Sequence, residues 1–185
     1  MLIYSMTTSA DGFMNDRDGG IDWTSPTDEL FAFHLERVRE LGMHLCGRRL
    51  YEIMLPWETD PSMRSTSLFA EFADAWSALP KVVFSRTLDR VVGNARLATG
   101  PIEEEVAAAL EATDKDVEIG GAELAGAAIG LGLVDDFRIF RSPILLGGGT
   151  PMLPPVTRNV TLDLAETSVF APGVIYERYL RRHDG

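Results

Sequence analysis

Short apolar runs alternate with segments of helical periodicity along the first 140 residues of the chain. Strands are predicted at residues 2–8, 43–46, 81–84, 117–119 and 137–140, with a further short strand within 91–98 and an extended segment at 143–146. Helices are predicted from Ser25 to residue 41, and over residues 50–54, 68–79, 101–110 and 122–131. Two terminal strands, 161–169 and 174–181, flank Ala171-Pro172-Gly173 and predict a hairpin.

The order of these elements predicts the fold class. Strands that alternate with helices form mainly parallel sheets with helices on both faces, and a hairpin adds antiparallel strands at one edge. We therefore expect an α/β fold with a mainly parallel central sheet flanked by helices and an antiparallel C-terminal hairpin.

Capping signals and prolines set the expected helix ends. Ser25 is the candidate N-cap of the first helix, Pro26 follows at its first position, and Asp28 completes a capping box. Gly42 is expected just beyond the end of this helix. Pro56 is expected to end the next helix, and residues 58–67 are expected to form a polar loop.

Composition and charge narrow the classes of function. The chain of 185 residues suits one domain, residues 1–185, with 45% apolar and 24% charged residues. A net charge of −11 argues against a binder of nucleic acids or anionic membranes, which needs a basic face. Cys46 is the single cysteine, and the chain shows neither a basic leader nor an apolar run long enough for a bilayer. We therefore expect a cytoplasmic protein.

Three junctions that follow predicted strands could bind a phosphate-bearing ligand. They are Gly47-Arg48-Arg49, Ser85-Arg86-Thr87 and Gly120-Gly121. In a parallel α/β sheet such junctions lie at the carboxyl edge, where guanidinium groups and the N–H groups of a helix N-terminus both bind phosphate. The alternatives are that the arginines are ordinary surface charges and that the glycine pair is an ordinary tight turn.

Asp28 is the candidate acid, because helical spacing puts it at the margin of the apolar face, where its pKa could be raised. The competing interpretation is the capping box, in which Asp28 is only a structural cap. Cys46 is expected to be buried in a strand and His34 to lie in the core or at an interface. Neither these residues nor His44 and His183 have the spacing of a metal site, so none is predicted.

Several motifs follow one another along the chain in a recognisable order. They are Trp23-x-x-Pro26-x-Asp28, Gly47-Arg48-Arg49-Leu50-Tyr51-Glu52, Val83-Phe84-Ser85-Arg86, Ile119-Gly120-Gly121-Ala122 and Pro143-Ile144-Leu145-Leu146-Gly147-Gly148-Gly149-Thr150-Pro151. With these motifs the chain resembles the dihydrofolate reductase superfamily, and within it the branch related to the reductase domain of riboflavin biosynthesis. The resemblance implies the three-layer dihydrofolate reductase-like fold.

The resemblance also implies an NADPH-dependent reductase and its cofactor site. The arginines would hold the 2′-phosphate, and the glycine turn with the helix after it would offer backbone N–H groups to the pyrophosphate. Thr7 would lie near the nicotinamide, under a loop that includes Gly19 and Gly20. The cofactor-binding residues so implied are Thr7, Gly19, Gly20, Gly47, Arg48, Arg49, Ser85, Arg86, Gly120, Gly121, Ala122, Glu123 and Leu124.

On the substrate side, the resemblance implies that Asp28 holds a small polar heterocycle, pterin- or pyrimidine-like, and helps to protonate it as hydride arrives at a C=N or C=O bond. Trp23, Arg141 and Thr150 are further candidates. Leu50 departs from the family pattern, because it stands where a threonine usually contacts the cofactor. The resemblance further suggests a homodimer.

Two alternatives to this reading remain open. One is a 5-amino-6-(5-phosphoribosylamino)uracil reductase of riboflavin synthesis, in which Arg141 and Thr150 would grip the substrate phosphate. The other is an NADP-binding protein without turnover, which Leu50 and the two interpretations of Asp28 keep possible.

Overall fold

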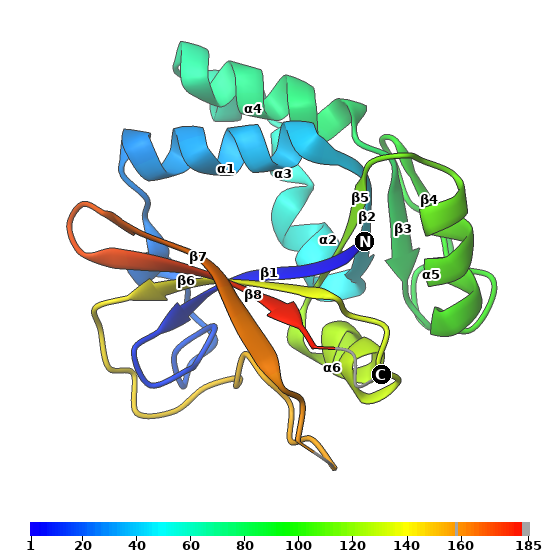
Figure 1. Cartoon of the computed structure of the whole chain (residues 1–185). Coiled ribbons are helices and arrows are strands. Elements are labelled where there is room, and N and C mark those ends of the chain that lie inside the picture. The colour runs from blue at the N-terminus through cyan, green and yellow to red at the C-terminus, as the bar shows by residue number, and fades with distance from the viewer. Residues whose placement is uncertain (158, 183–185) are drawn as a thin grey trace.

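The computed structural model describes residues 1–157 and 159–182, which are organised around an eight-stranded sheet (Figure 1). The strands follow the order β4-β3-β2-β5-β1-β6-β8-β7 across the sheet. Neighbours from β4 to β6 pair in parallel, whereas β8 pairs antiparallel with β6 and β7. The strands are β1 (Leu2–Ser9), β2 (Leu41–Gly47), β3 (Lys81–Phe84), β4 (Ala95–Leu97), β5 (Asp116–Gly120), β6 (Asp136–Ser142), β7 (Leu162–Phe170) and β8 (Val174–Arg181).

Successive residues of a strand point to opposite faces of the sheet. Apolar residues therefore emerge on both faces, and helices cover both. On β1, Leu2 and Tyr4 pack with residues of α5 and α6, whereas Ile3 packs with residues of α1 and α4. The helices are α1 (Asp28–Glu40), α2 (Arg48–Met54), α3 (Pro56–Thr59), α4 (Ser67–Ala78), α5 (Ile102–Glu111) and α6 (Ala122–Gly130). These layers and the C-terminal hairpin confirm the predicted fold class. No helix in residues 1–157 and 159–182 is long and apolar enough to cross a membrane.

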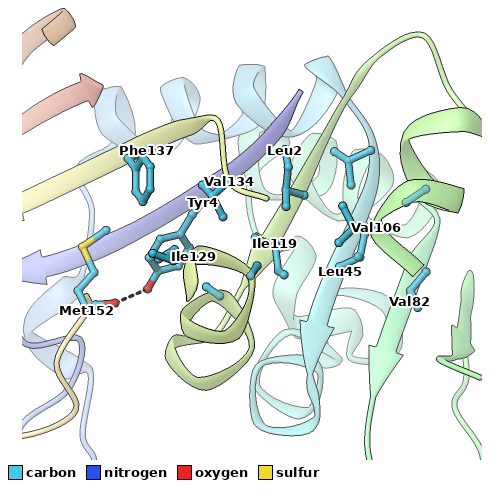
Figure 2. Packing of buried hydrophobic residues seen from close by; sticks show 14 of the residues in the cluster. Leu2, Tyr4, Leu45, Val82, Val106, Ile119, Ile129, Val134, Phe137 and Met152 are labelled. Carbon is cyan, nitrogen blue, oxygen red and sulfur yellow. Dashed lines mark hydrogen bonds between the residues drawn. The ribbon is translucent and has the colours of Figure 1, made fainter. Parts of the chain in front are cut away.

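The larger core lies between the sheet and the helices α5 and α6 (Figure 2). Leu45 and Ile119 come from adjacent strands of the parallel sheet, and Val106 covers them from α5. The fully buried Tyr4 donates a hydrogen bond from its hydroxyl to the Met152 carbonyl oxygen at 2.8 Å (Figure 2). This bond satisfies the buried phenol and connects β1 to the segment that follows β6.

The first helix begins later than predicted. Its N-cap is Thr27, whose hydroxyl accepts a hydrogen bond from the Leu30 N–H, and its first residue is Asp28. The predicted cap at Ser25 is therefore wrong, and so is the capping box, because Asp28 does not stand three residues into the helix. The helix passes directly into β2, so Gly42 lies inside a strand instead of following the helix.

Pro56 begins a helix as well as following one. Helix α2 ends at Met54 and α3 starts at Pro56, where a missing backbone N–H breaks no helical hydrogen bond. Residues 58–67, predicted as a loop, include the end of α3 and the 3-10 helix η2 (Pro61–Arg64). Residues 143–146 follow β6 without forming a strand, and His183 lies outside the described residues.

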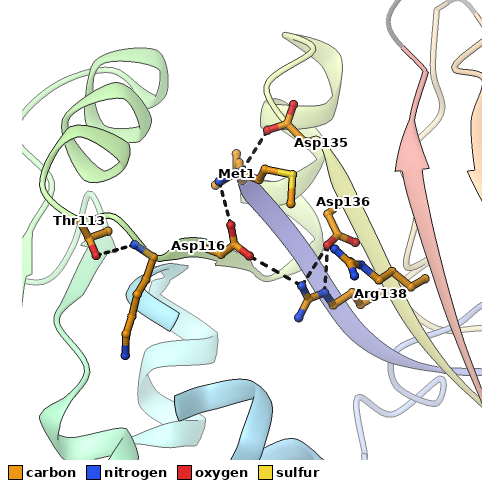
Figure 3. A network of polar contacts seen from close by, with 9 residues as sticks. Met1, Thr113, Asp116, Asp135, Asp136 and Arg138 are labelled. Atoms are coloured by element: carbon orange, nitrogen blue, oxygen red, sulfur yellow. Dashed lines mark hydrogen bonds and ion pairs between the residues drawn. The ribbon is translucent and has the colours of Figure 1, made fainter. Parts of the chain in front are cut away.

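Charged groups hold the start of the parallel sheet in place (Figure 3). The Met1 ammonium group lies 3.0 Å from Oδ1 of Asp116 at the start of β5. The buried Asp136 of β6 accepts hydrogen bonds from NH2 of Arg138 at 3.0 Å and from Nε of Arg178 at 2.9 Å. NH2 of Arg138 also lies 4.0 Å from Oδ2 of Asp116. The network therefore joins β1, β5, β6 and β8 at the edge of the sheet opposite the three glycine and arginine junctions.

Candidate functional site

The three junctions lie side by side at the carboxyl edge of the sheet. Strand β2 pairs with β3 through Gly47 and Phe84, and with β5 through Cys46 and Gly120. Three neighbouring strands therefore end together, and the next residues form Arg48-Arg49, Ser85-Arg86 and Gly120-Gly121. The convergence expected from a parallel sheet is present in the structure.

Hydrogen bonds connect the two arginine junctions. NH1 of Arg48 donates to Oγ1 of Thr87 at 3.1 Å. Ser85 shapes the second junction, because its Oγ accepts hydrogen bonds from the N–H groups of Thr87 at 3.1 Å and Leu88 at 3.0 Å. The Arg48 and Arg86 side chains are exposed. Two exposed guanidinium-bearing residues on adjacent strand ends suit a phosphomonoester.

Backbone conformation requires glycine at Gly121, whereas side-chain packing favours it at Gly120. A Cβ on Gly120 would collide with Cδ2 of Leu50 and would lie 3.2 Å from Nε2 of His44. Gly121 is the N-cap of α6 and has a φ of 91°, in the region that favours glycine, with nothing within 4 Å of the position its Cβ would take.

The helix that follows offers a backbone site for a pyrophosphate. No side chain in the described part of the chain caps α6, and the first hydrogen bond runs from the Ala125 N–H to the Gly121 carbonyl oxygen. The N–H groups of Ala122, Glu123 and Leu124 therefore begin the helix ahead of the first i to i−4 bond, where anions bind. The residues present fit the cofactor that the resemblance implies.

A cavity of about 280 Å³ lies beside this turn, between the sheet and helices α1 and α4. Thr7, Leu50 and Gly120 line it, so the cavity adjoins the residues assigned to the nicotinamide and pyrophosphate. The rest of its lining includes polar and charged side chains, namely His34, Arg37, His44, Trp76 and Glu118.

Two histidines of this cavity have pKa values shifted in opposite directions. Burial lowers the pKa of His34 to about 4, despite the opposing charge of Glu118. Burial also acts to lower the pKa of His44, but Cys46 and Glu118 outweigh it and raise that pKa to about 9. Nε2 of His44 lies 3.4 Å from Oε1 of Glu118. At neutral pH His34 is therefore uncharged, and His44 is a cation paired with a carboxylate.

A second, open hollow of about 460 Å³ brings together Gly19, Arg49 and Thr150. NH2 of Arg49 donates to the Gly19 carbonyl oxygen at 3.2 Å. The Asn15 side chain makes two hydrogen bonds to Thr150. Its Nδ2 donates to Oγ1 at 3.1 Å, and its Oδ1 accepts from the Thr150 N–H at 2.9 Å. Gly20 is fixed in the same loop by a 2.7 Å hydrogen bond from its N–H to Asp16. This hollow joins the predicted loop over the nicotinamide to one of the predicted arginines.

Three of the four residues predicted on the substrate side do not line either hollow. Asp28 is exposed at the start of α1 instead of lying at the margin of its buried face. Trp23 lies in the short 3-10 helix η1 (Asp22–Thr24). Arg141 of β6 forms an ion pair with Glu177 of β8, whose Oε2 is 3.1 Å from Nε and 3.0 Å from NH2. The structure therefore does not bring these side chains to the cavity.

The polar lining of the cavity was missed by sequence reasoning. His34, expected in the core or at an interface, lines the cavity, while Cys46 is buried as expected. His44 and Glu118 face each other on β2 and β5, on the side of the sheet opposite Leu45 and Ile119. Strand alternation could have placed both polar residues on one face, but local sequence does not reveal that β2 and β5 are partners.

Comparisons with known proteins identify the fold and the family of the chain. The chain is 29% identical over 182 residues to the uncharacterized protein YyaP of Bacillus subtilis (strain 168), covering 94% of this chain and 91% of that one. Its fold is similar to that of a provisionally named riboflavin biosynthesis protein from Shewanella sp. PV-4, with a TM-score of 0.77, 23% identity and coverage of 98% of this chain and 99% of that one.

The fold is also similar to that of a dihydrofolate reductase from Enterococcus faecalis complexed with NADP(H). The TM-score is 0.66 at 15% identity, with coverage of 99% of this chain and 97% of that one. These likenesses confirm the dihydrofolate reductase-like fold. The sequence profile of the RibD C-terminal domain matches residues 1–176. The chain belongs to the RibD C-terminal domain family.

Proposed function

We propose that this protein is an NADPH-dependent reductase that reduces a C=N or C=O bond in a small polar heterocycle, pterin- or pyrimidine-like. The observation that supports it best is that Gly120 belongs both to the turn before α6 and to the lining of the cavity. A dinucleotide bound along the carboxyl edge would therefore end at the cavity. When bound, the reduced nicotinamide supplies the hydride.

In this proposal the residues of the chain bind and orient the two reactants. Arg48, Arg49 and Arg86 take the 2′-phosphate, and the N–H groups that follow Gly121 take the pyrophosphate. Thr7 presents its part of β1 to the cavity, where the substrate ring would lie against the nicotinamide. The aromatic and aliphatic walls of the cavity exclude water from the reacting atoms.

Isothermal titration with NADPH and NADH tests the 2′-phosphate assignment. NADPH is expected to bind about tenfold or more tightly than NADH, because the two differ only in a group that suits the arginines. Arg48→Met and Arg86→Met should each weaken NADPH binding and leave NADH binding nearly unchanged. Arg90→Met, which removes an exposed arginine from the same loop, is the control. Equal affinities of the unmodified protein for the two cofactors would contradict the assignment.

Family membership favours one narrower activity, the reduction of 5-amino-6-(5-phosphoribosylamino)uracil. The residues expected to grip its phosphate are both engaged, because Arg141 pairs with Glu177 and Thr150 bonds to Asn15. The narrower activity is tested by adding this substrate to the protein with NADPH and monitoring the oxidation of NADPH through its loss of absorbance. If NADPH binds and neither pterins nor pyrimidines oxidise it, a binding protein without turnover is the better description.

A further inference from the structure

The reaction of the proposed function needs a proton as well as a hydride. The hydride adds to the carbon of the C=N or C=O bond, and the nitrogen or oxygen of that bond requires a proton, which a positioned side chain can supply. Asp28, the residue that the resemblance implies for this role, is exposed at the start of α1 and does not line the cavity. The proton must therefore come from another group or from water.

The titratable side chains that line the cavity in the described part of the chain are His34, Arg37, His44 and Glu118. Arg37 pairs with Glu40 at 2.8 Å, and a guanidinium group holds its proton too strongly to donate it. His34 is uncharged at neutral pH, because burial lowers its pKa to about 4. The remaining two form a pair, with Nε2 of His44 3.4 Å from Oε1 of Glu118.

His44 lies where the cavity meets the Gly120-Gly121 turn. A Cβ on Gly120 would lie 3.2 Å from Nε2 of His44, so this nitrogen faces a residue that belongs to both the turn and the cavity lining. The imidazole is buried, and Trp76 of α4, whose ring does not titrate, meets it edge-on with the ring centroids 5.1 Å apart. A ring bound at this junction would therefore lie close to Nε2.

The charged groups around His44 favour its protonated form. Burial acts to lower the pKa of His44, but Cys46 on the same strand and Glu118 on β5 raise it to about 9. Lys81 lies beside His44 on β3, and its Nζ is engaged by Glu58 at 3.0 Å and by two backbone carbonyl oxygens. At neutral pH the pair of His44 and Glu118 therefore holds a proton at the cavity.

We propose that His44 is the proton donor of the reduction and that Glu118 positions it and keeps it charged. The inference deepens the proposed function and rests on it. Nε2 of His44 gives its proton to the nitrogen or oxygen of the C=N or C=O bond as the carbon receives the hydride, so that the substrate gains two electrons and the nicotinamide loses them. An unprotonated Nε2 then faces the Glu118 carboxylate, and this repulsive contact favours uptake of a new proton from solvent after the product leaves.

Single-turnover oxidation of NADPH, with dihydropterin and 5-amino-6-(5-phosphoribosylamino)uracil as substrates, measures the step that needs the proton. Its rate constant should be level from about pH 6 and fall as the pH rises through about 9, because protonated His44 is the active form. His44→Gln should be slower by about a hundredfold or more at neutral pH and should not show this fall. A fall that both proteins share belongs to the substrate, so the difference between their pH profiles reports His44.

Glu118→Gln distinguishes a positioning role from a merely structural one. Loss of the opposite charge should lower the pKa of His44 by about one unit or more, so the fall in rate should move to lower pH by the same amount. His34→Gln changes the other histidine of the cavity and is the matched control, in which the fall should stay at the pH of the unmodified protein. An unshifted fall in Glu118→Gln would overturn the proposal, as would a His44→Gln protein with the unmodified rate and pH profile.

NMR titration of the His44 imidazole in the cofactor-free protein gives a readout that needs no turnover and stands even if His44→Gln does not fold. The resonance should titrate near pH 9 in the unmodified protein and about one pH unit or more lower in Glu118→Gln. Titration of His44 below neutral pH in the unmodified protein would overturn the inference. If neither substrate oxidises NADPH, the proposed function fails and the inference fails with it, whereas turnover that His44→Gln retains in full contradicts only the inference.

Discussion

At the scale of single residues, His34 and His44 line one cavity with pKa values of about 4 and about 9. Heteronuclear NMR of the imidazole groups between pH 3.5 and 10 is expected to show the two titrations well apart, at those ends of the range. His34→Gln and His44→Gln assign the resonances. Two histidines titrating together near their ordinary pKa of 6.5 would contradict the burial and pairing described for this cavity.

The same shifts give stability a defined dependence on pH. Folding favours neutral His34, so its contribution is present above pH 6.5 and is lost as the pH falls toward 4, by at most about 3 kcal/mol. Folding favours charged His44, so its contribution is present below pH 6.5 and is lost as the pH rises through about 9. Urea unfolding of His34→Gln should lose less stability between pH 6.5 and 4 than the unmodified protein. An identical loss would contradict this account of His34.

At the scale of elements, Ser25 and Thr27 are both candidate N-caps of α1 in the sequence, and the structure distinguishes them. Thr27→Ala should lower the free energy of unfolding by about 1 kcal/mol, because its hydroxyl accepts from the Leu30 N–H. Ser25→Ala should change it much less, since Ser25 lies outside the helix. Urea unfolding measures both. A larger loss of unfolding free energy for Ser25→Ala than for Thr27→Ala would contradict the assignment of Thr27 as the cap and favour the capping box.

Local signals in the sequence predict the order and type of most elements. They predict the residues at which the elements begin and end less accurately. Apolar spacing identified α1, and the junctions after β2, β3 and β5 were readable because glycines and arginines directly follow apolar strands. The cap was misplaced because Ser25-Pro26 and Thr27 both satisfy local preferences, and the longer-range contact of Thr27 with the Ala171 carbonyl oxygen is invisible in a sequence. Helix α2 ends before Pro56 as predicted, and Pro56 also begins α3, because proline is tolerated in the first turn of a helix.

At the scale of the whole molecule, Asp136 connects the parallel strands to the C-terminal hairpin. It is fully buried and accepts from Arg138 and Arg178. Asp136→Asn should lower the free energy of unfolding by about 3 kcal/mol or more, because Arg138 is left buried without its carboxylate. Asp163→Asn, which breaks an exposed pair with Arg182, should have little effect in the same urea unfolding experiment. Similar losses for the two variants would contradict the role of Asp136.

The part of the candidate site that could be predicted from the sequence consists of the residues that directly follow the ends of strands. The junctions converge because the parallel order guarantees it, whereas the cavity depends on which strands are neighbours. His44 meets Glu118 only because β2 pairs with β5, some 70 residues apart in the chain. Arg141 looked available for a substrate because its partner Glu177 lies in the distant hairpin. Asp28 fits its motif in sequence, yet its side chain is exposed.

A crystal structure of the protein soaked with NADPH measures the geometry on which the proposed function depends. We expect the 2′-phosphate between Arg48 and Arg86, the pyrophosphate on the N–H groups after Gly121, and the nicotinamide at the mouth of the cavity beside Thr7. A cofactor bound away from the carboxyl edge of β2, β3 and β5, or a nicotinamide outside the cavity, would contradict it.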